Sequence, residues 1–235
     1  MNNVRTVSDT KRAFYSIHTR PINSIYRRVV EELMVEMHLL SVNVDFQYNP
    51  IYGLGVVTSF DRFMQGYRPD RDKESIFQAL CQSLEADAQQ YRQDAEWLQN
   101  MAANHSGEEM VELLSLSANP DMESDFQGIL HAIANNPKFK YSRLFAVGLF
   151  TLLEKADPER VTNDQKRQEA LHKMTKALNL PAEKIQKDLE LYRSNLEKIT
   201  QARLVMEDIL AADRKKREER EQQKGAVTTP PSSPE

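Results

Sequence analysis

Residues 18–40 read HTRPINSIYRRVVEELMVEMHLL, and the apolar positions from Ile22 onward decide the fold class. An apolar side chain recurs every three or four residues, at Ile22, Ile25, Val29, Leu33, Met37, Leu40 and Val44. Because an α-helix has about 3.6 residues per turn, this spacing lines one helical face. Pro21 and its neighbours suit the start of such a helix, since proline is tolerated in the first turn. The stretch therefore predicts a long amphipathic helix.

The same spacing recurs along most of the chain, divided by the seven prolines that precede the tail. Further helices are predicted over residues 73–103, 108–118, 123–135, 141–155 and 158–178. Residues 51–67 are ambiguous, because Val56, Val57 and Thr58 suit a strand whereas the spacing from Leu54 to Tyr67 favours a helix. Since glycine is scarce and good helix formers abound, the sequence predicts an all-α protein. Residues 1–180 are expected to form a single multi-helix bundle.

The last predicted helix runs from residue 181 to residue 224 and carries a heptad pattern. Its apolar positions step alternately by four and three from Ile185 to Leu210, with Arg203 as one charged interruption. A helix of this length would extend about 66 Å, so part of it is expected to project beyond the bundle. The seam has coiled-coil character, but its interruption at Arg203 favours a monomer over a dimer. Residues 225–235, GAVTTPPSSPE, have the composition of a disordered tail.

The composition of the whole chain limits the class of protein. The net charge is −4, which does not favour nucleic acid as a partner. Cys81 is the only cysteine, so no internal disulfide can form, and its place beside an apolar stripe indicates a core residue. The N-terminus lacks the apolar segment of a secretory signal. The longest apolar run, residues 144–153, is shorter than the roughly 20 residues that a membrane-spanning helix needs. A soluble or membrane-surface protein is therefore expected.

The sequence offers no convincing catalytic or metal-binding set. His38 follows several glutamates, but Val35 occupies the place of the glutamate in the Glu-x-x-His spacing of a carboxylate-bridged metal site. One such spacing, Glu169–His172, lies alone on a charged helix. The segment Gly53–Gly55 lacks the third glycine of a dinucleotide loop, so its glycines are expected to be close-packing points or a helix irregularity. No catalytic residue, metal or cofactor is predicted.

The first 30 residues carry six basic residues and one acidic residue, a net charge of +5 in a chain whose total is −4. Four arginines are expected to form a partner-binding surface that meets an acidic partner or anionic lipid headgroups: Arg12, Arg20, Arg27 and Arg28. Three side chains are expected to support this surface by holding the first two helices together: Tyr15, His18 and Tyr26. The alternative is a solvated helix face, in which Arg27 and Arg28 make weak pairs with Glu31 and Glu32 one turn away.

A second candidate surface is residues 138–154, KFKYSRLFAVGLFTLLE, where three cations precede a strongly apolar helix. A helix that is apolar on all sides is usually buried at the centre of a bundle, which is the expectation here. The alternative is a membrane-surface element with a basic collar.

The chain closely resembles the thylakoid formation proteins, also called photosystem II biogenesis proteins, over residues 6–69, which read TVSDTKRAFYSIHTRPINSIYRRVVEELMVEMHLLSVNVDFQYNPIYGLGVVTSFDRFMQGYRP. Residues 141–154, YSRLFAVGLFTLLE, look like the second diagnostic block of that family. The resemblance covers roughly residues 4–210. Plant relatives carry a transit peptide that this sequence lacks, so the chain looks like a cyanobacterial member.

The resemblance implies an all-helical, non-catalytic accessory protein for thylakoid membrane biogenesis and for photosystem II assembly and repair. It implies an adaptor or stabiliser of the FtsH membrane protease complex, with the photosystem II assembly and repair machinery and the thylakoid membrane surface as further partners. It also implies a peripheral location on the cytoplasmic side of the thylakoid membrane, with a soluble pool in the cytoplasm. The alternative is a membrane-organising protein that binds anionic lipid through its basic face and self-associates.

Overall fold

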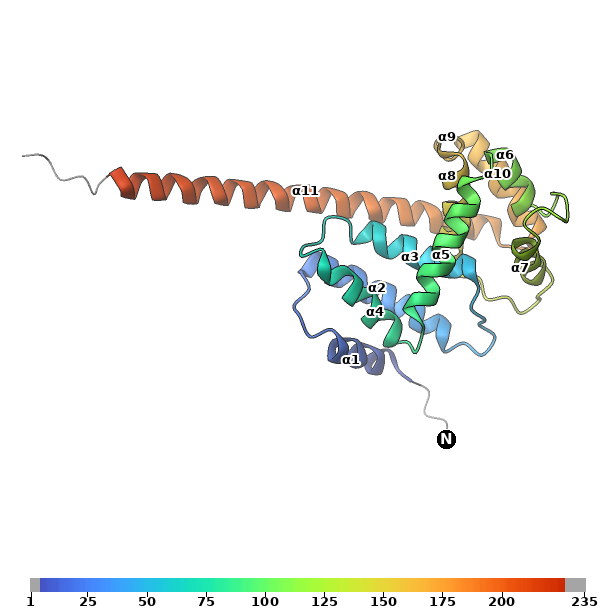
Figure 1. Ribbon diagram of the computed structural model, residues 1–235, viewed down its shortest axis with the longest axis horizontal. Helices are drawn as coiled ribbons and strands as arrows, with labels where there is room; N and C mark the ends of the chain where they lie inside the picture. Colours follow the sequence, from blue (N-terminus) through green and yellow to red (C-terminus); the bar gives the residue numbers. More distant parts are fainter. Residues whose placement is uncertain (1–4, 227–235) are drawn as a thin grey trace, which may run out of the picture. The chain divides into compact units, whose positions relative to one another are not determined.

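The computed structural model describes residues 5–226 and shows an all-α protein, as the sequence predicts (Figure 1). Within the described residues there is no strand. The chain divides into two units, one up to Ser194 and one from Asn195 onward. The helices are α1 Val7–Ile17, α2 Ser24–Ser41, α3 Pro50–Phe63, α4 Arg71–Gln82, α5 Ala88–Ala103, α6 Gly107–Leu114, α7 Ser124–Ala134, α8 Arg143–Ala156, α9 Pro158–Thr162, α10 Asp164–Ala177 and α11 Ala182–Ala226.

Side-chain caps fix where several helices begin. Thr6 and Asp9 form a reciprocal capping box at α1, in which each side chain accepts from the backbone N–H of the other residue. The Asn49 side chain accepts from the Tyr52 N–H at the start of α3, and Pro50 takes the first helical position. The ambiguous segment after residue 50 is therefore a helix, as its apolar spacing favours.

Two helices that the sequence predicts as continuous are each divided. Residues 73–103 form α4 and α5, because Glu85 adopts a left-handed conformation with φ 59° and Asp87 caps the next helix. Residues 158–178 form α9 and α10, because the Asn163 side chain accepts from the Lys166 N–H and starts a new helix. In both cases a side-chain cap starts a new helix inside the predicted range.

The core of the first unit is built on the close approach of α3 and α8. Residues 51–60 of α3 and residues 144–153 of α8 are all buried, which confirms that the apolar helix lies at the centre of the bundle. A Cβ atom added at Gly55 would lie 1.7 Å from the Leu144 carbonyl oxygen, and one added at Gly148 would lie 2.0 Å from the Ile51 carbonyl oxygen. The two backbones therefore touch, and only glycine fits at both contact points.

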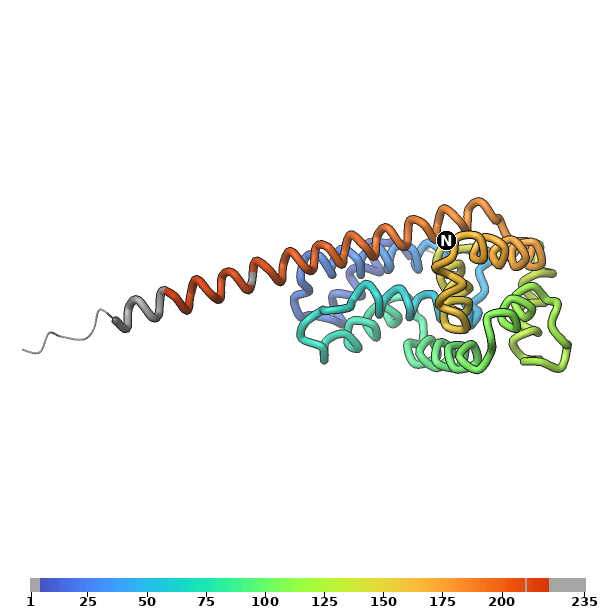
Figure 2. The backbone as a smooth tube through the Cα atoms, turned by 90° about the horizontal axis from the view of Figure 1, so that it is seen from above, coloured from blue at the N-terminus to red at the C-terminus, as the bar shows by residue number. Residues whose placement is uncertain are grey.

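Six further helices of the first unit form two groups around α3, α5 and α8. Helices α1, α2 and α4 lie on one side, and α6, α9 and α10 lie together on another, a division that two perpendicular views show (Figures 1 and 2). Of the basic N-terminal helices, α1 packs on α2 and α4, and α2 also packs on α3.

The beginning of α11 is part of the first unit. Ile185, Leu189 and Tyr192 are almost fully buried. The Tyr141 hydroxyl donates to Asp188 over 2.7 Å, and the rings of Phe63 and Tyr192 pack edge to face at 5.6 Å. The first unit therefore extends past residue 180, where the sequence places the end of the bundle, into the long C-terminal helix.

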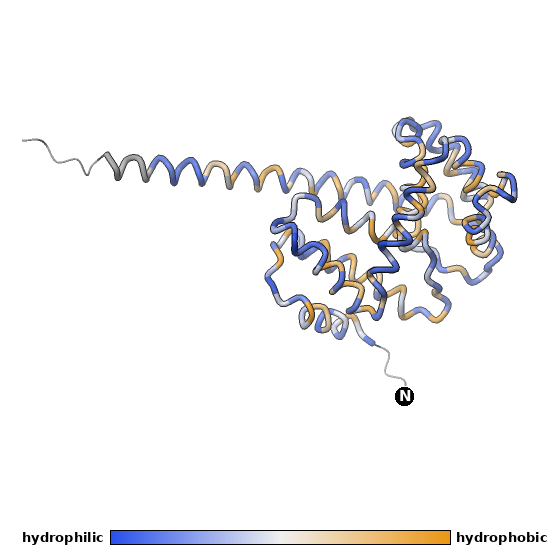
Figure 3. Tube along the Cα trace, in the orientation of Figure 1, coloured by the Kyte–Doolittle hydropathy of each residue, from blue (hydrophilic) through white to orange (hydrophobic). Residues whose placement is uncertain are grey.

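The second unit continues α11 from Asn195 as a single helix. Its described residues are predominantly hydrophilic, with isolated apolar positions (Figure 3). Among these, Leu204, Val205 and Ile209 are exposed. Residues 225 and 226 of the expected tail belong to α11, and residues 227–235 lie outside the described part of the chain. Among the described residues, no helix is both long and apolar enough to cross a membrane.

Candidate functional site

The four arginines proposed as a binding surface lie on α1, on α2 and between them. Arg12 is in α1, Arg20 is in the connection, and Arg27 and Arg28 are in the first turns of α2. The Arg12 and Arg28 side chains are 80% and 83% exposed, respectively. All four residues are exposed, but they differ in what they contact.

Arg20 has a structural partner in α4. Its Nη2 atom lies 3.0 Å from Oδ1 of Asp72, an ion pair without hydrogen-bond geometry. The Asp72 side chain is only 6% exposed, whereas that of Arg20 is 51% exposed. Because a buried carboxylate needs a counter-charge, Arg20 stabilises the packing of the α1–α2 connection on α4. This engagement separates Arg20 from the other three arginines.

Replacing Arg20 with glutamate is expected to lower the free energy of unfolding by about 3 kcal/mol, because it places a second carboxylate beside buried Asp72. Urea denaturation followed by circular dichroism measures the change. The double variant Arg20→Glu/Asp72→Asn should recover most of the loss, and Arg12→Glu should have little effect. A single Arg20→Glu variant as stable as the wild type would show that the ion pair contributes nothing.

The remaining three arginines have weak partners or none. Arg12 lies 3.6 Å from Asp9 on its own helix, and Arg28 donates to Glu32 over 2.9 Å one turn along α2. Arg27 has no ion pair within 4.0 Å among residues 5–226. Exposed pairs of this kind contribute little to stability. Arg12, Arg27 and Arg28 can therefore bind an external anion at little cost to the fold.

Tyr15 joins α1 to α2, as expected of a supporting residue. Its hydroxyl donates to Glu31 over 2.6 Å, and Lys11 donates to the other oxygen of Glu31, also over 2.6 Å. Burial, followed by the bond to Glu31, raises the pKa of Tyr15 to about 12, so the phenol keeps its proton at neutral pH. The bonds from Lys11 and Tyr15 lower the pKa of Glu31, which keeps that group ionised. Glu31 lies one turn after Arg27 on α2.

His18 and Tyr26 also have partners outside the first two helices. Nδ1 of His18 lies 3.1 Å from the Ser75 hydroxyl of α4, while burial and the nearby Arg20 lower the pKa of His18. The Tyr26 hydroxyl donates to the Gln65 carbonyl over 3.2 Å, and its ring packs edge to face on Tyr67. These two residues fix the region against α4 and the segment after α3.

Sequence reasoning missed several residues that position this surface. Thr10 and His38 are both buried, and their side chains lie 2.9 Å apart, so they tie α1 to α2. Arg5 pairs with Glu85 at 3.1 Å, and Lys11 pairs with Glu31. These two ion pairs neutralise part of the positive charge of the N-terminal region within the same chain. The four-residue spacing of Thr10, Phe14 and His18, which places them on one side of α1 and its C-cap, was the available signal for the Thr10 contact.

A groove elsewhere in the first unit offers no free charge to a partner among its described lining residues. A shallow groove of ≈ 350 Å³ lies between the end of α2, the start of α8 and the start of α11. Its charged residues pair with one another, Glu36 with Arg143 and Lys184 with Asp188. Within residues 5–226, no group of three or more His, Cys, Asp or Glu side chains is placed to hold a metal ion.

Comparison with known proteins finds the same family by sequence profile and by individual relatives. The sequence profile described as thylakoid formation protein matches residues 6–221. Protein Thf1 of Nostoc punctiforme is 62% identical over 235 residues, which is the full length of both chains. Protein Thf1 of a Picosynechococcus species is 56% identical over 92% of this chain and 85% of its own.

A solved structure supports the same assignment. The structure of Psb29 is 47% identical in sequence, with a TM-score of 0.77, and the match covers 91% of this chain and 98% of that one. Profile, sequences and fold agree over nearly the whole length. The chain therefore belongs to the thylakoid formation protein family.

Proposed function

We propose that this protein is a non-catalytic accessory factor for thylakoid biogenesis and for photosystem II assembly and repair, and that it acts as an adaptor or stabiliser of an FtsH-type membrane protease. Membership of the thylakoid formation family over residues 6–221 supports the general role. In this proposal the protein lies peripherally on the cytoplasmic side of the thylakoid membrane and has a soluble cytoplasmic pool.

The exposed arginines of α1 and α2 carry the adaptor proposal. Arg12, Arg27 and Arg28 are exposed and have no ion-pair partner in another element of the described chain. Tyr15 and Lys11, through Glu31, hold the helices that carry them in a fixed arrangement. A fixed set of guanidinium groups suits an acidic segment of a partner protein, because each can donate two parallel hydrogen bonds to a carboxylate.

The test is affinity purification of the tagged full-length protein from detergent-solubilised thylakoids, with bound proteins identified by mass spectrometry. The wild type should recover the protease, and the variant Arg12→Glu/Arg27→Glu/Arg28→Glu should recover at least about tenfold less, since each reversal replaces an attraction with a repulsion. Arg20 is left unchanged, because its reversal would destabilise the fold.

A matched control reverses three exposed lysines of α10 in the variant Lys166→Glu/Lys173→Glu/Lys176→Glu. It changes the net charge by the same amount as the arginine variant but on another helix. Recovery should then equal that of the wild type. Equal recovery of the protease by the arginine variant would reject the docking surface, and absence of the protease from the wild-type sample would reject the adaptor role.

A membrane-organising protein remains the second candidate function. Three exposed aliphatic residues at the end of α2, Leu39, Val42 and Val44, favour it, because they offer a surface for lipid rather than for a charged protein. Recovery of lipid without protease in the purification would support this candidate.

A further inference from the structure

Three aliphatic side chains are exposed within six residues at the end of α2. Leu39, Val42 and Val44 are 61%, 38% and 97% exposed, respectively. Isolated apolar residues are common on protein surfaces, but a cluster of them marks an interaction site. Val44 follows the helix in a turn that the Phe46 N–H closes by donating to the Asn43 carbonyl, and its side chain is almost fully exposed.

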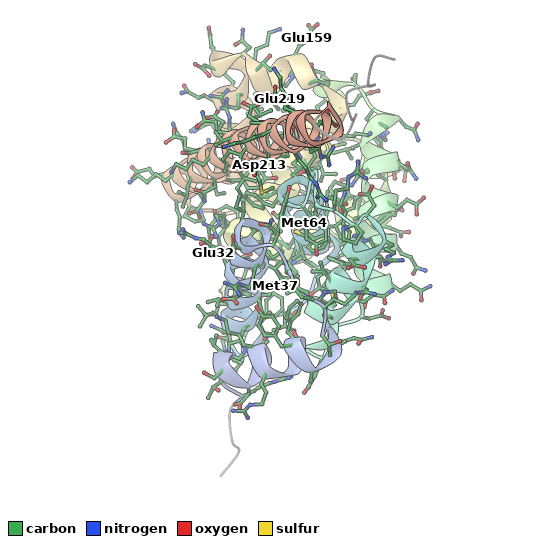
Figure 4. All side chains as sticks on the ribbon, turned by 90° about the vertical axis from the view of Figure 1, so that its left-hand side faces the viewer. Glu32, Met37, Met64, Glu159, Asp213 and Glu219 are labelled. Carbon is green, nitrogen blue, oxygen red and sulfur yellow. The ribbon has the colours of Figure 1, made fainter. Side chains whose placement is uncertain are left out.

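The cluster continues a face of α2 that points away from the core. Leu39 and Val42 are three residues apart and follow Glu32 on the same side of the helix. Figure 4 shows Glu32 on the outside of the molecule and Met37, from the opposite side of α2, in the interior. The aliphatic groups therefore stand out from a helix whose other face is anchored in the bundle.

Two lysines accompany these groups. Lys138 and Lys140 both reach Asp45, the residue after Val44, at 3.7 and 3.4 Å. Two ammonium groups share one carboxylate, so the trio keeps a net charge of +1 beside the exposed valine. A small excess of positive charge next to apolar side chains is complementary to a bilayer surface, where anionic headgroups lie above hydrocarbon.

The shape of this region also favours a lipid surface over a protein partner. The neighbouring groove, which Leu39 helps to line, is shallow, and its charged residues already pair with one another. Val44 projects beyond any such groove and would need a receiving pocket on a protein partner. A bilayer accepts projecting aliphatic groups without a pre-formed pocket.

We propose that Leu39, Val42 and Val44, flanked by Lys138 and Lys140, insert into the interfacial region of a bilayer and hold the protein on the membrane. This inference names a membrane-contact element and rests on the peripheral location in the proposed function, but it is independent of the arginines of α1 and α2. Protease binding in detergent can fail while this contact holds, and the reverse is equally possible.

The test is flotation of the full-length protein with vesicles of phosphatidylcholine, with and without one part in four of phosphatidylglycerol. The wild type should float with both. Val44→Asp and Leu39→Asp should each lower the partition coefficient about tenfold or more, because burial of one such side chain accounts for at least that factor. Lys138→Gln leaves Lys140 to neutralise Asp45, so it should remove only the gain from phosphatidylglycerol, a factor of about five.

The matched control is Val205→Asp, which makes the same change at an exposed valine of the second unit. Its partition should equal that of the wild type, and circular dichroism should show every variant folded, since the changed side chains are exposed. Wild-type protein that does not float, unchanged flotation of Val44→Asp and Leu39→Asp, or an equal loss with Val205→Asp would each overturn the proposal.

Discussion

Replacing Gly55 with alanine is expected to lower the free energy of unfolding by about 3 kcal/mol or more, and Gly148→Ala is expected to act in the same direction. The added Cβ atoms would lie 1.7 Å from the Leu144 carbonyl oxygen and 2.0 Å from the Ile51 carbonyl oxygen. Both obstructing atoms belong to the backbone, so relief requires α3 and α8 to move apart. Urea denaturation of the two variants measures the loss.

Gly128→Ala provides the control for this pair. Gly128 is an exposed position of α7, and a Cβ atom added there meets nothing within 4 Å. Because alanine favours the helix over glycine, this variant should gain about 0.5–1 kcal/mol. If Gly55→Ala and Gly128→Ala were equally stable, the close contact of α3 and α8 would not hold in solution.

The fold class follows from the sequence, whereas the contact between α3 and α8 does not. Apolar spacing predicts the helices, and the cap at Asn49 confirms that the ambiguous segment begins one. The sequence predicts a close-packing point or a helix irregularity at Gly53–Gly55, and Gly55 is a packing point. Its counterpart Gly148 lies 93 residues away in sequence, and nothing local shows which two turns meet.

The candidate surface shows the same limit. The positive excess of the first 30 residues is visible in the sequence, but the partner of each charge is not. Arg20 pairs with Asp72 and Arg5 with Glu85, across 52 and 80 residues of chain. Which residues form such long-range ion pairs depends on tertiary packing. Because Arg20 pairs with buried Asp72, a charge-reversal experiment on the binding surface should leave Arg20 unchanged.

Truncation of the chain after Leu180 is expected to abolish cooperative folding, whereas truncation after Ser194 should preserve it. The shorter chain lacks Ile185, Leu189 and Tyr192, whose burial stabilises the first unit by about 6 kcal/mol together. That amount is comparable to the whole stability of a typical domain, about 5–15 kcal/mol. Thermal unfolding followed by circular dichroism should show a sharp transition only for the chain that ends at Ser194.

The same pair of truncations separates folding from self-association. A change of oligomeric state after truncation at Leu180 cannot be assigned to a coiled coil, because the first three apolar positions of the heptad pattern belong to the core of the first unit. Truncation after Ser194 removes the second unit alone, including Arg203, which interrupts the seam. Light scattering should then report a monomer both for the full chain and for residues 1–194. If the full chain were a dimer and the chain ending at Ser194 a monomer, the second unit would self-associate despite Arg203. A well-folded chain that ends at Leu180 would contradict the role of α11 in the core.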